Sequence, residues 1–182
     1  MKLYLITSNK HKAAEFRTIL EPKIKVEHIQ LEYPEMRSDD SEEIARLAAK
    51  QLAEQLKKPV VVEDSGLFIK ALNGFPGTCS AYIHKRIGLV GILNLMKGIK
   101  DREAMYISAV GYCEPNKQPL SFLGTEKGTI ALKIRGAFGF GHDPIFIPEG
   151  EKKTFGEMKD YKKRFRRIAV EKLIVYIEKT NK

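Results

Sequence analysis

The stretch Val60 to Phe68, VVVEDSGLF, joins three β-branched residues to two adjacent carboxylates, a serine and a glycine. Its first three residues have the composition of a buried strand. Because buried charge is costly unless it is paired or solvated, we expect the strand to end at Val62 and its acids, Glu63 and Asp64, to lie at its carboxyl end. Ligands of open α/β sheets bind beyond the carboxyl ends of the strands. The alternative is an acidic exit into a turn, with Gly66 at the bend.

The N-terminal segment predicts two further strands and a helix. Residues 2–6 (KLYLI) form a short apolar run, and the apolar residues after them, as far as Leu20, follow helical spacing. Residues 23–29 alternate between apolar and polar side chains, as a half-buried strand does. A break at Pro34 then leads into an acidic loop.

A second helix is predicted directly before VVVEDSGLF. Asp40 followed by Glu43 resembles a capping box with Asp in place of Ser or Thr. Apolar residues recur at every fourth position from Ile44 to Leu56, and Pro59 closes the helix. A strand reached through a helix indicates a βαβ unit with a parallel pair of strands.

The C-terminal half predicts a helical region, a meander and a final helix. Residues 67–98 are mostly helical in pattern with glycine punctuation, and apolar residues from Phe165 to Ile177 define an amphipathic helix. Three antiparallel strands are expected between them, over Met105–Cys113, Pro119–Leu123 and Thr129–Ile134. The whole pattern predicts the α/β class.

Composition limits the class of protein. The chain has 182 residues and a formal net charge of +9, which favours an anionic partner. Its two cysteines, Cys79 and Cys113, are in neither CxxC nor zinc-ligand spacing, and no apolar run has the length of a membrane span. We expect a single domain over residues 1–182 that is soluble and cytoplasmic. The basic run KDYKKRFRR, residues 159–167, is most simply a solvated helix face.

A polar segment, TSNKHK, stands where the first strand turns into a helix. It consists of Thr7, Ser8, Asn9, Lys10, His11 and Lys12. Free N–H groups and the helix dipole favour an anion at such a point, and the lysines add charge that a phosphate chain would use. The alternative is ordinary N-capping by Ser8 or Asn9. It is not a P-loop, because GxxxxGK[ST] does not occur in the chain.

Two carboxylates suggest a metal site. Glu35, in the loop at Pro34, is a third acid that the fold would have to bring to Asp64. Mg²⁺ is commonly held by one or two carboxylates together with substrate phosphates. Two acids beside a lysine-lined anion site would therefore describe magnesium and a polyphosphate. The alternative for Glu35 is a plain surface acid.

A glycine-rich loop carries an aromatic residue. FGHD comprises Phe140, Gly141, His142 and Asp143. Phe140 is suited to stacking on a base, while backbone groups read the base edge. The alternative is a turn with a packed phenylalanine.

Together these stretches resemble the inosine triphosphate pyrophosphatase family over nearly the whole chain. The resemblance rests on TSNKHK beside the family's T-G-N-x-x-K, on YPE, VEDSGLFIKALNGFPGTCSAY and GFGHDPIFIPEG, and on KTFGEM. It implies an elongated, two-lobed α/β fold, a mixed sheet flanked by helices with the active-site cleft between the lobes. It also implies a homodimer that hydrolyses ITP, dITP and XTP to monophosphate and pyrophosphate and so sanitises the nucleotide pool.

The resemblance also implies roles for single residues. Glu35 and Asp64 would hold Mg²⁺, and Asp64 would also be the base for the attacking water. Ser65 would touch the nucleotide. Residues 7–12 would surround the triphosphate, and residues 140–143 would form part of the base and sugar pocket.

The sequence departs from the family at several positions. Ser8 replaces the usual glycine, His142 replaces a Tyr or Trp, and Ala48 stands where many relatives carry a substrate-binding lysine. The family's K…S-H-R signature is absent, and Lys163 and Arg166 are its nearest counterparts.

We therefore expect a Mg²⁺-dependent pyrophosphatase acting on a purine nucleoside triphosphate, with no membrane partner. The alternatives are a nucleotide pyrophosphatase of different base preference and a catalytically weakened homologue that binds nucleic acid. The run KKRFRR suggests the last of these, although no nucleic-acid-binding signature accompanies it.

Overall fold

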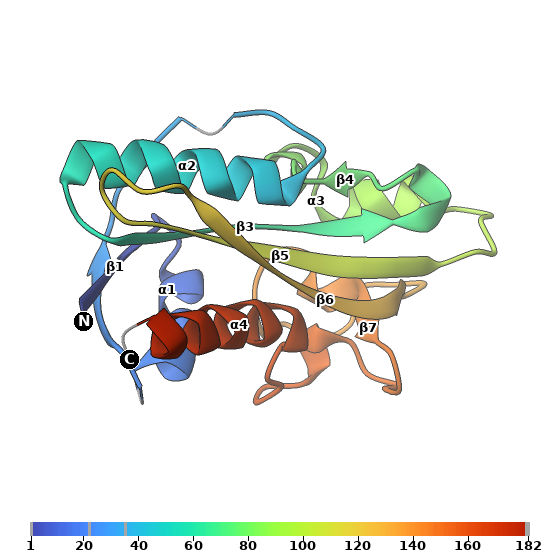
Figure 1. Cartoon of the computed structure of the whole chain (residues 1–182). Coiled ribbons are helices and arrows are strands. Elements are labelled where there is room, and N and C mark those ends of the chain that lie inside the picture. The colour runs from blue at the N-terminus through green and yellow to red at the C-terminus, as the bar shows by residue number, and fades with distance from the viewer. Residues whose placement is uncertain (1, 22, 35, 181–182) are drawn as a thin grey trace. The chain divides into compact units, whose positions relative to one another are not determined.

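A computed structural model describes residues 2–21, 23–34 and 36–180. Figure 1 labels the helices and strands, and the chain divides into two compact units. Unit 1 comprises residues 1–64, 108–124 and 165–182, and unit 2 comprises residues 65–107 and 125–164. Among the described residues the seven-stranded sheet has the order β2-β1-β3-β5-β6-β7, with β4 paired to β3. The α/β class predicted from the sequence is confirmed.

Unit 1 contains the predicted parallel strands. β1 (Lys2–Ile6) pairs in parallel with both β2 (Lys25–Ile29) and the start of β3 (Val60–Ile69). The βαβ prediction is therefore confirmed. The second strand begins at Lys25, two residues later than the alternation indicated.

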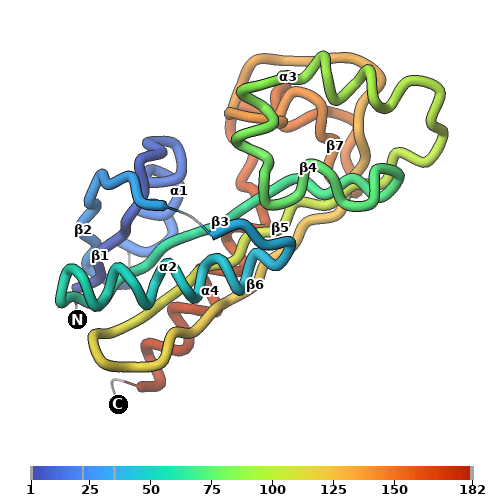
Figure 2. Tube along the Cα trace, turned by 90° about the horizontal axis from the view of Figure 1, so that it is seen from above, coloured from blue at the N-terminus to red at the C-terminus, as the bar shows by residue number. Residues whose placement is uncertain are grey.

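Helices cover both faces of the unit 1 sheet. α1 (Lys10–Leu20) and α4 (Arg164–Thr180) pack with Leu3, Leu5 and Val61 in one apolar cluster. α2 (Ser41–Leu56) packs with Ile6, Val60 and Val62 in another. Figure 2 shows the trace of α2 on the near side of the sheet. This division follows from the strand geometry, because successive side chains point to opposite faces.

The N-terminus of α2 differs from the predicted capping box. Asp40 is the N-cap, and its side chain accepts a hydrogen bond from the Glu42 N–H at 2.8 Å. The Glu43 carboxylate instead accepts from the hydroxyl of Ser38 at 2.6 Å, and Ser38 also accepts from the Asp40 N–H. The Ser38 hydroxyl therefore accepts the hydrogen bond from the Asp40 N–H that the Glu43 carboxylate would accept in a capping box.

The prediction that the strand ends at Val62 is wrong. β3 continues through Glu63, Asp64, Ser65 and Gly66 to Ile69, so the acids lie in the middle of a strand. Gly66 is not at a bend: a Cβ there would lie 2.0 Å from the carbonyl oxygen of Gly77 on β4, the strand that pairs with it. The helical pattern predicted from residue 67 begins only with η1 (Lys70–Leu72) and is interrupted by β4 (Pro76–Gly77).

The predicted meander is also partly wrong. β5 (Glu103–Cys113) was expected, but β6 (Leu120–Ile130) is one long strand where two were predicted, and residues 131–134 lie outside it. The division of β6 into two strands was predicted because glycine is common in turns and Gly124 lies within this strand. A Cβ at this position would lie 2.0 Å from the carbonyl oxygen of Phe165 in α4, so the glycine permits close packing in unit 1.

Unit 2 is organised around aromatic side chains. It contains α3 (Ser80–Leu95), which is kinked at Gly88, and short elements at η2 (Asp143–Ile145), β7 (Phe146–Pro148) and η3 (Phe155–Glu157). The rings of Tyr106, Phe146, Phe155 and Tyr161 form a chain of contacts with centroids 4.8 to 5.9 Å apart. No helix in the described part of the chain is long and apolar enough to cross a membrane.

Candidate functional site

The TSNKHK segment turns from β1 into α1 through a side-chain cap. Asn9 is the N-cap, and its Oδ1 accepts from the N–H groups of His11 and Lys12 at 2.9 and 3.2 Å. Thr7 Oγ1 accepts from the Asn9 N–H at 3.1 Å. Of the two residues offered as caps, Asn9 is therefore the one observed. The cap leaves Ser8 and Lys10 exposed at the start of the helix.

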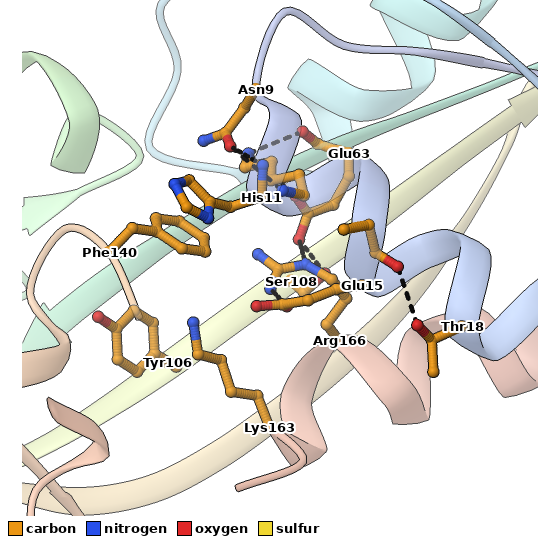
Figure 3. Close-up of polar contacts among 12 residues, drawn as sticks. Asn9, His11, Glu15, Thr18, Glu63, Tyr106, Ser108, Phe140, Lys163 and Arg166 are labelled. Carbon is orange, nitrogen blue, oxygen red and sulfur yellow. Dashed lines mark hydrogen bonds and ion pairs between the residues drawn. The ribbon is translucent and has the colours of Figure 1, made fainter. Parts of the chain in front are cut away.

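Glu63 is the centre of a buried ionic cluster in unit 1 (Figure 3). Its Oε1 accepts from Ser108 Oγ at 2.7 Å and from Arg166 Nε at 3.0 Å. Its Oε2 lies 2.9 Å from Lys12 Nζ, which also donates to the Glu63 carbonyl oxygen at 3.3 Å. Arg166 Nη1 forms a second ion pair, with Glu15 on α1.

The cluster explains why the buried acid Glu63 is tolerated within a strand. Burial by itself raises the pKa of Glu63, but the charges of Arg166 and Lys12 and the hydroxyl of Ser108 outweigh it and lower that pKa to about 2. Glu63 is therefore ionised at neutral pH. Burial opposes the charge of Arg166, whereas Glu63 and Glu15 favour it, and the net result is a raised pKa.

Arg166 lies at a place that the sequence did not predict. Its side chain is 1% exposed, and its Nε and Nη1 donate to Glu63 and Glu15. Using these atoms to bind a base would break one of the two ion pairs. Sequence reasoning missed Glu15 and Ser108. Glu15 could have been noticed because it stands one helical turn after Lys12, and Ser108 because it is a polar residue within an apolar strand.

Asp64 is separated from this cluster by strand geometry. Its neighbour Glu63 points to the side of α1 and α4, as Val61 does, so Asp64 projects to the side of α2, as Val60 and Val62 do. Asp64 is buried, with 8% of its surface exposed, and Ser65 after it is half-buried. Glu35, its predicted partner in a metal site, lies outside the described residues.

The FGHD loop in unit 2 is organised by Asp143. The Asp143 carboxylate is buried, and its Oδ2 accepts from the Phe140 N–H at 2.7 Å and lies 2.8 Å from Lys163 Nζ. The ammonium of Lys163 is also 4.1 Å from the centroid of the Phe140 ring (Figure 3). Gly139 has a φ of +76°, and a Cβ there would lie 2.1 Å from Asp143 Oδ2. The structure thus brings Phe140, Asp143 and Lys163 together.

Two other loop residues differ in environment. Gly141 has a φ of +62°, with open space around its Cβ position. His142 is 3% exposed and packs edge-on against His84 of α3, with ring centroids 5.0 Å apart. Burial, together with His84, lowers the pKa of His142 to about 4, so its imidazole is neutral at pH 7.

The basic run 159–167 is not a single solvated face. Lys163 and Arg166 are 9% and 1% exposed and pair with buried acids, which contradicts the simple expectation for these two residues. Arg164 is more exposed but pairs with the buried Glu126 at 3.1 Å. Arg167 pairs with Glu171 at 3.8 Å, so four cations of the run form intramolecular ion pairs among the described residues.

The fold and these clusters define an α/β protein with an acidic strand, a lysine at a helix start and an aromatic glycine-rich loop, a set of groups suited to a phosphorylated ligand. A family model described as the Ham1 family matches residues 3–176, and the chain belongs to this family.

Curated relatives agree with this assignment. A dITP/XTP pyrophosphatase of Methanopyrus kandleri is 54% identical over 159 residues, which are 87% of this chain and 85% of the relative. A dITP/XTP pyrophosphatase of Thermococcus kodakarensis is 45% identical, with the same coverage. These names confirm the resemblance found in the sequence.

Solved structures agree as well. The Ham1 protein of Staphylococcus aureus superposes with a TM-score of 0.83 at 30% identity, covering 97% of this chain and 99% of that chain. The Ham1 protein of Coxiella burnetii has the same TM-score at 27% identity and covers 98% and 99%.

Proposed function

We propose that this protein hydrolyses dITP, XTP and ITP to the nucleoside monophosphate and pyrophosphate and thereby removes non-canonical purines from the nucleotide pool. The observation that carries the proposal is the 54% identity to a dITP/XTP pyrophosphatase across 87% of the chain. The described residues supply groups of the right chemistry for each part of such a substrate.

Mg²⁺ is the cofactor that the carboxylates fit best. Mg²⁺ prefers oxygen ligands and keeps waters and substrate phosphates in its coordination shell. Glu63 is not a suitable ligand, because both its carboxylate oxygens are engaged by Ser108, Arg166 and Lys12. Asp64, directed away from those cations, and Glu35 are the residues that would hold the ion. When bound, the ion would neutralise charge on the triphosphate.

Asp64 is also the proposed general base. A carboxylate within hydrogen-bond reach of the attacking water can accept its proton. The water would attack the α-phosphorus, which breaks the α–β bond and releases pyrophosphate. The proton passes to Asp64, and the bridging oxygen leaves with the β-phosphate.

The start of α1 would bind the phosphates. Lys12 donates to two oxygens among the described residues, both of Glu63, and an ammonium has three donors. Glu63 thus fixes the direction of Lys12 while one donor remains for a phosphate oxygen. Thr7, Ser8, Asn9, Lys10 and His11 would complete the phosphate site.

The FGHD loop would bind the base and sugar. Phe140 offers a ring for stacking, and Lys163 with Asp143 places a donor and an acceptor beside that ring. Gly141 and His142 would line the same pocket, and Ser65 would touch the nucleotide. We assign Arg166 to holding Glu63, with a contact to the nucleotide as its second role. We propose a homodimer in the cytoplasm as the working state.

The test is a panel of nucleoside triphosphates incubated with and without Mg²⁺, with both products identified. Pyrophosphate and monophosphate formed from ITP, dITP and XTP only with Mg²⁺ is the expected result. Orthophosphate and diphosphate as primary products would contradict the proposed point of attack.

Nucleic-acid binding is the alternative function, and the structure offers little for it. Four cations of the run 159–167 pair with acids of the same chain among the described residues. A protein that binds nucleic acid through this run would lose affinity steeply with salt and would release no pyrophosphate from any triphosphate.

A further inference from the structure

The first residue of the TSNKHK segment is held at three atoms, two of them by residues of β2. The Thr7 N–H donates to the carbonyl oxygen of Ile29 at 3.3 Å. The Thr7 carbonyl oxygen lies 2.8 Å from Nε2 of His28, and Thr7 Oγ1 accepts from the Asn9 N–H. Because a carbonyl oxygen only accepts hydrogen bonds, Nε2 is the ring nitrogen that carries the proton. The imidazole of His28 therefore donates to the backbone directly after the end of β1.

The His28 side chain supplies a donor that the strand pairing does not. The parallel pairing of β1 with β2 ends at Ile6 and Ile29, and in the described part of the chain no backbone N–H donates to the Thr7 carbonyl oxygen. A backbone carbonyl needs such a partner or a water molecule. His28 and Thr7 are both half-buried, and a hydrogen bond is stronger where water is partly excluded.

The contact also fixes the direction of the next amide. The peptide unit between Thr7 and Ser8 is trans and planar, so the Ser8 N–H points opposite to the Thr7 carbonyl. That carbonyl faces β2, and β1 lies between β2 and β3 in the sheet. The Ser8 N–H therefore points to the β3 side, as does the Tyr4 N–H, which donates to the carbonyl oxygen of Pro59 at 3.0 Å.

The β3 side is where the proposed reaction would take place. β1 and β3 pair with Leu5 opposite Val61, and the same register continued for three residues sets Ser8 opposite Asp64. Ser8 is exposed, and its N–H donates to no acceptor among the described residues. An amide that is held in position before a phosphate arrives needs no reorganisation to bind it.

We propose that His28 is a positioning residue for the triphosphate, which holds the Ser8 N–H as a donor to a phosphate oxygen. The inference rests on the proposed function. His28 itself touches no substrate and acts through the peptide unit of Thr7 and Ser8. Because the donor is a backbone group, it does not depend on the side chain at position 8, where serine replaces the family's usual glycine.

The experiment measures binding of inorganic pyrophosphate with Mg²⁺ to the full chain by calorimetry. His28→Leu removes the donor to Thr7, and the affinity should fall by about tenfold, the typical contribution of one hydrogen bond to a charged group. His28→Gln keeps a side-chain N–H donor and should stay within about threefold of the wild-type affinity. Glu27→Gln is the matched control on the same strand. It removes an ion pair with Lys2 and should leave the affinity unchanged.

The amide proton resonance of Ser8 reports the proposed hydrogen bond directly. In the wild-type protein it should move downfield on adding pyrophosphate, and the shift should be smaller in His28→Leu. If His28→Leu does not fold, the shift in the wild-type protein and in His28→Gln still tests the proposal.

Three results would overturn the proposal. They are wild-type affinity in His28→Leu, the same loss of affinity in His28→Gln as in His28→Leu, and a Ser8 resonance that pyrophosphate does not move. Neither readout requires hydrolysis. A failure of the proposed function is therefore a separate result, seen as no release of pyrophosphate from any triphosphate by the wild-type protein.

Discussion

Lys163 and Arg166 stand three positions apart at the start of α4, yet each neutralises a buried acid in a different unit. Lys163 pairs with Asp143 in unit 2, and Arg166 pairs with Glu63 in unit 1. Glu63 has the cations Lys12 and Arg166 and a serine hydroxyl around it, whereas Asp143 has the cation Lys163, a long contact of 3.5 Å from the Tyr106 hydroxyl and a backbone N–H of its own loop. The first arrangement fixes Lys12 at the start of a helix, and the second fixes the conformation of a loop. Under the proposed function, unit 1 would supply the phosphate chemistry and unit 2 would recognise the base.

Asp64→Asn should produce the largest effect, because it removes the proposed base and a metal ligand. General-base catalysis contributes about 10²–10⁴-fold, so kcat should fall by at least about 100-fold while the protein stays folded. Steady-state pyrophosphate release measures kcat, and circular dichroism checks the fold. Turnover within a few-fold of the wild-type rate would remove Asp64 from the reaction.

Arg166→Met should destabilise unit 1 strongly. It leaves Glu63 and Glu15 without their shared cation, and breaking a buried ion pair by removing one partner costs about 3–5 kcal/mol. The free energy of unfolding in urea is the measurement. Arg167→Met is the matched control, because Arg167 and its partner Glu171 are 38% and 54% exposed and losing such a surface pair should cost about 1 kcal/mol or less. Equal losses in the two variants would contradict the role of Arg166 as an anchor.

Lys12→Met and Lys163→Met should separate binding of the phosphates from binding of the base. Removing Lys12 should lower kcat/KM for every nucleoside triphosphate by a similar factor, because all of them share the triphosphate. Removing Lys163 should change the ratio of kcat/KM between ITP and ATP, by about 1–3 kcal/mol if it leaves a buried polar group unpaired. The same change in kcat/KM across the nucleotides in both variants would contradict the assignment of phosphate binding to Lys12 and base recognition to Lys163.

The contribution of Glu63 to stability should depend on pH in the acid range only. Its pKa is lowered from 4.5 to about 2 in the folded protein, so the folded state favours the ionised form. The stabilisation is present above pH 4.5 and is lost as the pH falls from 4.5 towards 2. The difference in unfolding free energy between the wild-type protein and Glu63→Gln should therefore shrink over this interval. A difference that is constant with pH would show that Glu63 is not ionised in the folded chain.

Local patterns in the sequence predicted the elements that depend on local periodicity. The start of β3 at Val60, helix α2 and the parallel pairing of β1 were accessible in this way. The end of β3 was not, because the partners of Glu63 lie 51 and 103 residues away. Because the cations that neutralise Glu63 are so distant in the sequence, no local pattern indicates them. The two acids were therefore predicted to lie at the end of a strand.

The candidate site was predictable to a similar degree. Motifs located Phe140 and Asp143, and the structure adds Lys163 beside them. The ion-pair partners of Arg166 were not predictable, because Glu15 and Glu63 come from other elements. Position along a helix does not show which buried acid an arginine will meet.

The most direct test of the central claim is the ratio of kcat/KM for ITP over ATP, measured with the wild-type protein in Mg²⁺ with release of pyrophosphate as the readout. A site built to bind a 6-oxo purine leaves buried groups unpaired when adenine enters it, so we predict a ratio of at least about 100. A ratio near one would contradict recognition of the base by unit 2, even if both nucleotides were hydrolysed at the α–β bond.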